Sequence, residues 1–214
     1  MAYQIRFNSD ATSVAVNKYD TIKERLENIY ARMTNVENEL DHAWDGAASE
    51  EAVREIREIS NAVKGCAHAA SQGMIALKSA MQMFSSVSII GGTVAYGEDL
   101  ASRFITVGAR LRIPEIRFRS NKEIRINPQQ VIALAHSYRT AAEEVEDIAQ
   151  FHRSLLDGLQ ESWEGNAYQQ FLDSFQNLDR MLMQIHDAAI GLSKEMVTIA
   201  ERYQAIDNER SRYQ

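Results

Sequence analysis

Residues 40–46 read LDHAWDG and residues 159–165 read LQESWEG, and these two stretches decide the fold. Both contain Trp-x-Gly, and they hold the two tryptophans of the 214-residue chain. Because background glycine is about 7%, two unrelated tryptophans would both be followed by Gly at that spacing only about once in 200 sequences. A shift of 119 residues superimposes the two stretches without a gap, and it also superimposes IRFN at residues 5–8 on IRIN at residues 124–127. The pattern indicates an internal duplication.

The sequence around each copy has the spacing of long helices. Apolar or small residues recur in alternating steps of four and three over residues 171–206, which is a heptad seam on one helix face. The equivalent seam of the first copy covers residues 52–87, and similar seams precede both Trp-x-Gly motifs. Gly supplies the left-handed backbone that ends a helix, so each motif predicts the turn of a helical hairpin. Asn8 and Asn127 are the predicted N-caps.

Seams on both helices leave each hairpin with more apolar surface than it can bury alone. We therefore expect an all-α fold in which two hairpins pack as an elongated four-helix bundle. The predicted parts are a first hairpin over residues 1–88, a connector over residues 89–123 and a second hairpin over residues 124–214. Within the connector, apolar and polar residues alternate on either side of residues 120–122, which predicts a small β-hairpin. The connector is also long enough to let the hairpins pack turn to tail.

The composition excludes several classes of function. The net charge of −7 argues against binding nucleic acid through its phosphates. The single cysteine, Cys66, excludes an internal disulfide framework and a multi-thiol metal site. A di-iron site in a helical bundle needs two Glu-x-x-His motifs, and the chain has one, at residues 39–42. We therefore expect no metal, no cofactor and no enzymatic activity.

The sequence also indicates how the protein would leave a cell. No stretch approaches the ~20 apolar residues of a membrane span. The N-terminal sequence MAYQIRFNSD lacks the basic and then apolar pattern of a signal peptide. We expect any export to use a leaderless route.

A Trp-x-Gly turn between two long helices, preceded by the short leads IRFNS and IRINPQQV, resembles the WXG family. These small proteins are exported by the type VII (ESX-like) secretion systems of Gram-positive bacteria and mycobacteria. A second motif of the family is a C-terminal Tyr-x-x-x-(Asp/Glu), which YQAID at residues 203–207 matches. The first copy lacks this motif, because Phe84 and Ser88 stand at the equivalent positions. The resemblance covers roughly residues 5–87 and 124–208.

The resemblance implies a non-enzymatic substrate or secreted factor of type VII secretion, recognised by the secretion ATPase and its machinery. In the family, the tyrosine-motif tail of one partner lies beside the Trp-x-Gly turn of the other, and the two form a composite export signal. The second turn, with Trp163 and Gly165, is then structural. The implied location is outside the cell or on its surface, with membrane contact only through the secretion apparatus. The residues implied to form the export signal are Trp44, Gly46, Tyr203 and Asp207.

Three questions stay open at this stage. Family members work as dimers of separate hairpins, whereas two are fused here, so the protein forms either a homodimer, a complex with a secreted toxin or neither. A different class of function is a cytosolic adaptor or chaperone that holds the helical targeting domain of a larger secreted toxin, and an unrelated helical scaffold is a third class. A basic strap in the connector either lies against the acidic bundle or contacts anionic lipid or an acidic partner. Its residues are Arg110, Arg112, Arg117, Arg119 and Lys122.

Overall fold

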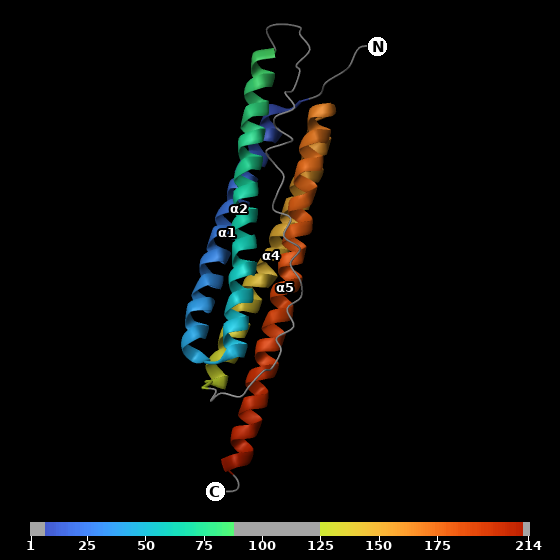
Figure 1. The fold of residues 1–214 in the computed structure, drawn as a ribbon. Coiled ribbons are helices and arrows are strands. Elements are labelled where there is room, and N and C mark those ends of the chain that lie inside the picture. The colour runs from blue at the N-terminus through green and yellow to red at the C-terminus, as the bar shows by residue number, and fades with distance from the viewer. Residues whose placement is uncertain (1–6, 88–124, 212–214) are drawn as a thin grey trace. The chain divides into compact units, whose positions relative to one another are not determined.

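The computed structural model describes residues 7–87 and 125–211, which contain four α-helices and no β-strand (Figure 1). The predicted all-α fold class is confirmed. The β-hairpin predicted in the connector lies outside the described residues, as does the basic strap. The helices are α1 (Ser9–Ala43), α2 (Ala47–Val87), α4 (Pro128–Ser162) and α5 (Asn166–Ser211).

The helix bounds repeat with the offset found in the sequence. Helices α1 and α4 both contain 35 residues, and their first and last residues are 119 positions apart. Helices α2 and α5 also begin 119 positions apart. We call two positions equivalent when this offset relates them.

Asparagine caps set the starts of α1 and α4. The Asn8 Oδ1 accepts hydrogen bonds from the backbone N–H groups of Asp10 (3.0 Å) and Ala11 (3.1 Å). The Asn127 Oδ1 accepts one from the N–H of Gln130 at 3.2 Å. Both predicted N-caps are confirmed, because these bonds satisfy N–H groups that a helix start leaves without a partner.

The heptad seams form the buried core, but the seam of α5 emerges from it near the end of the helix. Along α5 the seam is buried from Phe171 to Ile199, after which Tyr203 is half-buried and Ile206 is 50% exposed. Along α2 the seam stays buried up to Ala80. On α5, the heptad pattern therefore continues beyond the part of the helix that other helices cover.

Packing divides the chain into two compact units, each taking segments from all four helices. Unit 1 takes its described residues from Met1–Glu27, Lys64–Ala109 and Asp147–Met183. Unit 2 takes its described residues from Asn28–Val63, Arg110–Glu146 and Gln184–Gln214. Unit 1 therefore holds the second Trp-x-Gly turn, and unit 2 holds the first. Each unit contains residues of both predicted hairpins, so the hairpins meet within each unit.

Candidate functional site

In unit 2, the first Trp-x-Gly turn pairs with the lead into the second hairpin. Trp44 and Ile126 form an isolated antiparallel β-bridge. The N–H of Asp45 donates to the carbonyl of Arg125 at 2.7 Å, and the N–H of Asn127 donates to the carbonyl of Ala43 at 2.8 Å. The turn of the first hairpin thus holds the start of the second by backbone hydrogen bonds.

In unit 1, the same pairing occurs with the hairpins exchanged. Phe7 and Trp163 form the equivalent antiparallel β-bridge. The N–H of Asn8 donates to the carbonyl of Ser162 at 3.0 Å, which is the equivalent of the bond between Asn127 and Ala43. Each hairpin therefore closes its turn on the other hairpin's lead. This is the turn-to-tail arrangement that the connector length allows.

The glycine of each turn has a backbone conformation that other residues rarely adopt. Gly46 has φ = 116° and Gly165 has φ = 117°. Among the described residues, no residue other than glycine has a positive φ. A Cβ added at Gly165 would meet nothing within 4 Å, so backbone strain and not lack of space selects glycine there. The preceding tryptophans are almost fully buried, at 1% exposure for Trp44 and 2% for Trp163.

An aromatic cluster covers the turn in unit 1. The ring centroid of Trp163 lies 5.7 Å from that of Phe7 and 6.4 Å from that of Phe84, both in edge contacts. Phe7 and Phe84 stack on each other at 4.2 Å. Tyr168 and Phe171 pack on the indole of Trp163, with ring centroids 5.8 and 5.6 Å from its own. The end of α2 is therefore fixed against the turn by stacked rings.

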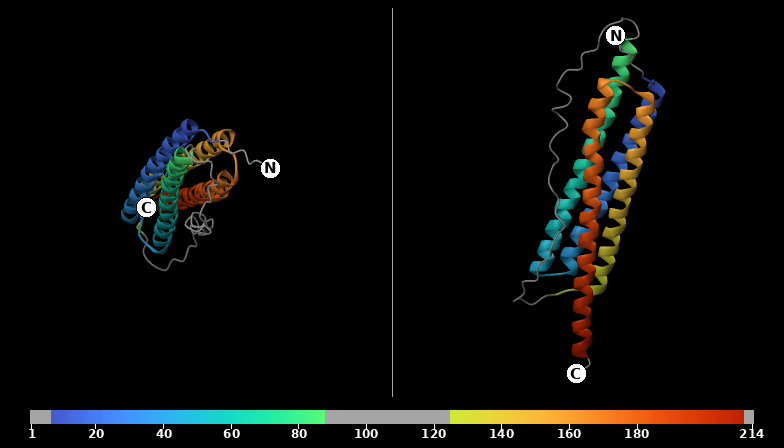
Figure 2. Two further views of the ribbon diagram at one scale, coloured as in Figure 1. Left: turned by 90° about the horizontal axis from the view of Figure 1, so that it is seen from above. Right: turned by 90° about the vertical axis from the view of Figure 1, so that its right-hand side faces the viewer.

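The end of α5 is placed differently in unit 2. Tyr203 is equivalent to Phe84 but is half-buried, and burial raises the pKa of its hydroxyl above the ordinary value of 10.0. Asp207, one turn further on, is exposed. Figure 1 and the right-hand view in Figure 2 both show the last turns of α5 running past the turn between α1 and α2. Unit 2 thus contains all four residues predicted for the export signal, including Trp44 and Gly46.

Unit 1 also contains a buried polar group that the sequence did not identify as a site. The hydroxyl of Tyr19 lies 3.0 Å from Nε2 of His152, and both side chains are fully buried. The Nδ1 of His152 lies 3.7 Å from Oδ1 of Asp179, whose Oδ2 accepts a hydrogen bond from Arg153. Burial raises the pKa of Asp179, but the interactions with His152 and Arg153 outweigh burial and hold the pKa of that carboxyl below its ordinary value.

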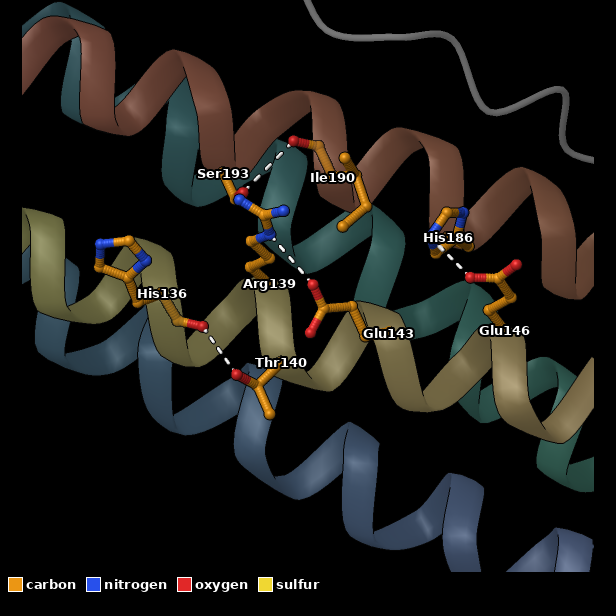
Figure 3. Close-up of polar contacts among 8 residues, drawn as sticks. All are labelled: His136, Arg139, Thr140, Glu143, Glu146, His186, Ile190 and Ser193. Atoms are coloured by element: carbon orange, nitrogen blue, oxygen red, sulfur yellow. Dashed lines mark hydrogen bonds and ion pairs between the residues drawn. The ribbon is translucent and has the colours of Figure 1, made fainter.

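The polar contacts on the outer face of unit 2 are of a simpler kind. Figure 3 shows Arg139 reaching Glu143 one turn along α4, with an N···O distance of 3.1 Å. In the same view, His186 of α5 lies 3.6 Å from Glu146 of α4. The pair of Arg139 and Glu143 is exposed and lies within one helix, so it stabilises that helix by only about 0.3–0.5 kcal/mol. Arg139 is therefore a suitable position for a control substitution.

Three other features bear on function, namely a metal site, a reactive cysteine and a membrane-spanning helix, and the described part of the chain supports none of them. Within residues 7–87 and 125–211, no group of three His, Cys, Asp or Glu side chains could hold a metal ion. Burial raises the pKa of the Cys66 thiol to about 12, so the reactive thiolate is scarce at neutral pH. None of the described helices combines the length and apolar character needed to cross a membrane.

These observations define a class of protein: helical hairpins closed by Trp-x-Gly turns, each turn paired with the start of the other hairpin. Residues 123–208, essentially the second hairpin, match the family model WXG100, described as proteins of 100 residues with WXG. The second hairpin is therefore similar to the WXG family, and the first copy repeats its Trp-x-Gly turn. Members of this family are secreted helical proteins associated with type VII secretion. No curated protein and no solved structure matches the chain.

Proposed function

We propose that the protein is a substrate or secreted factor of type VII secretion, built as two WXG hairpins in one chain. The observation that carries the proposal is the reciprocal pairing of turns and leads, since Trp44 binds the lead of the second hairpin and Trp163 binds the lead of the first. A pair of separate hairpins would need two chains to build these ends. Here a single chain supplies both partners.

The secretion machinery would recognise the end that contains the first turn. Phe84 packs against Trp163 in unit 1, and its equivalent in unit 2 is Tyr203, which favours a position for Tyr203 beside Trp44. The half-burial of Tyr203 and the raised pKa of its hydroxyl agree with that position. Asp207 on the same helix face is exposed and would present a carboxylate next to the aromatic ring.

The other end lacks the chemical groups of the signal. Phe84 has no hydroxyl and is stacked on Phe7, and the residue equivalent to Asp207 is Ser88. We therefore assign Trp163 and Gly165 a structural role. One chain would then carry one export signal, although it contains two Trp-x-Gly turns.

A secretion assay tests the proposal. The wild type, Tyr203→Ala and Asp207→Asn are produced in the native bacterium while its type VII system is active, and culture supernatant and cell extract are blotted. We expect a loss of about tenfold or more from the supernatant for both variants, with accumulation inside the cell. The control Arg139→Ala changes an exposed residue of unit 2 and should leave secretion unchanged.

Stability must be measured on the same variants, because an unfolded substrate also fails to leave the cell. Residues 205–209 are exposed, so Asp207→Asn should keep the thermal midpoint of the wild type within about 2 °C. A wild type that never appears outside cells with an active system contradicts the proposal. If the protein instead stays inside the cell and binds a larger toxin that is secreted, the adaptor or chaperone function is supported.

A further inference from the structure

The cores of the two units differ around one buried tyrosine in each, Tyr19 in unit 1 and Tyr138 in unit 2. In unit 1, the ring of Tyr19 packs on Phe175 with centroids 5.5 Å apart, beside Gly73. A Cβ added at Gly73 would lie 2.8 Å from Cε1 of Tyr19 and 2.9 Å from Cε1 of Phe175. Close-packed interiors do not tolerate such contacts, so even a methyl group at this position requires the rings to move.

In unit 2, the same positions are occupied by residues of different size. Tyr138 is equivalent to Tyr19, and the positions of Gly73 and Phe175 are taken by Leu192 and Ile56. All three residues of unit 2 are fully buried. Unit 1 thus combines a glycine with a phenylalanine, and unit 2 combines a leucine with an isoleucine.

Each of these compensating pairs is divided between the two hairpins. Gly73 and Ile56 belong to the first hairpin, whereas Phe175 and Leu192 belong to the second. We infer that the core face of each hairpin is fitted to the other hairpin and misfits a second copy of itself. This inference does not depend on export.

Two copies of the same hairpin would not fit each other: two second hairpins would overfill the core, and two first hairpins would leave it underfilled. Two second hairpins would place Leu192 and Phe175 around a tyrosine at both ends, where the structure shows that even a methyl group beside Phe175 is too large. Two first hairpins would place Gly73 and Ile56 there, which leaves a void at both ends. Only the unlike pairing fills both cores.

A surface ion pair between the two hairpins also favours the unlike pairing. In unit 2, Arg32 of the first hairpin pairs with Glu144 of the second at 2.8 Å. The position equivalent to Glu144 is Arg25, so two first hairpins would bring two arginines together. The position equivalent to Arg32 is Phe151, so two second hairpins would lose the pair. Because both Arg32 and Glu144 are about 40% exposed, this effect is smaller than that of the core.

Partner choice can be measured after cutting the folded, full-length protein. A protease site is inserted between Val87 and Asn127, each half carries a different tag, and the cut protein is unfolded in denaturant and refolded. We expect native mass spectrometry to show unlike pairs in about tenfold or greater excess over like pairs. A statistical mixture of like and unlike pairs would overturn the inference, and so would halves that no longer associate.

A double-substitution cycle tests the size match in the intact chain. Gly73→Leu should lower the thermal midpoint by about 5–10 °C, because it overfills the core of unit 1. Adding Phe175→Ile reproduces the combination found in unit 2 and should recover about half of that loss or more. Should Gly73→Leu fail to fold, Gly73→Ala with Phe175→Leu gives the same comparison. If the decreases in thermal midpoint caused by the two substitutions simply add in the double variant, the two positions are not matched in size.

Discussion

Units 1 and 2 are built from equivalent positions of the same four helices, yet they are filled in different ways. Unit 1 surrounds its turn with stacked aromatic rings and places a histidine against its buried tyrosine. Unit 2 has Ile126 and Tyr203 where unit 1 has Phe7 and Phe84, and its helix α5 emerges from the core. The backbone pairing at the turns is common to both units. The turn is therefore the shared framework, and the side chains packed around it set the two ends apart.

Removing the centre of the aromatic cluster in unit 1 should cost the protein the most stability. Trp163→Ala should lower the free energy of unfolding by about 3–5 kcal/mol, because it leaves a cavity between Phe7, Phe84 and Phe171. Urea denaturation followed by circular dichroism measures the loss. The control Trp163→Phe should cost much less, since it keeps an aromatic ring and removes an indole N–H that is buried without a hydrogen-bond partner among the described residues. A loss below about 1 kcal/mol for Trp163→Ala would show that the cluster does not hold this end.

The two buried tyrosines provide a matched pair of substitutions. Tyr19→Phe should lower the free energy of unfolding by about 1–3 kcal/mol, because it removes the hydroxyl that satisfies the buried Nε2 of His152. The hydroxyl of Tyr138 has no hydrogen-bond partner among the described residues, and the position equivalent to His152 is Met33. Tyr138→Phe should therefore be neutral or slightly stabilising.

Chemical denaturation of both tyrosine variants at pH 7 makes the comparison. Tyr19 and Tyr138 are both fully buried, so loss of packing cannot explain a difference between them. Equal changes in stability would contradict the assignment of a distinct polar interaction to unit 1.

The sequence predicts the shared framework well because its signals are local. Glycine two residues after tryptophan marks both turns, and asparagine at the helix starts marks both caps. The contact between Tyr19 and His152 joins residues 133 positions apart, and the repeat offers no clue because only one copy has the histidine. Periodicity also fails at the end of α5. The seam continues to Ile206 although that residue is half exposed, since a heptad pattern shows which face is apolar but not what covers it.

The two turns should respond alike, unlike the two cores. Gly46→Ala and Gly165→Ala should each lower the free energy of unfolding by about 1–2 kcal/mol, because both glycines have a φ that strains any residue with a Cβ. Gly158→Ala is the control, since this glycine lies on the exposed face of α4 and a Cβ there meets nothing within 4 Å. It should stabilise the helix by about 0.5–1 kcal/mol. Thermal melts of the three variants compare them, and a loss at Gly158 similar to that at the turns would remove backbone strain as the cause.

A weak dependence of stability on pH should arise in unit 1 and not in unit 2. The folded state holds the pKa of Asp179 below its ordinary value of 3.8, so this carboxylate contributes stability that is present above pH 4–5 and is lost as the pH falls through the lowered folded-state pKa. The contribution should be about 1 kcal/mol or less, because Arg153 is half exposed and solvent screens the pair. Urea denaturation of the wild type and of Asp179→Asn from pH 7 to pH 3 measures the difference in the free energy of unfolding, which should shrink toward the acidic end. Ser60 occupies the equivalent position of unit 2, so Ser60→Ala should give a difference that does not change with pH. A difference for Asp179→Asn that stays constant over this range would show that the carboxylate is not held by charge in unit 1.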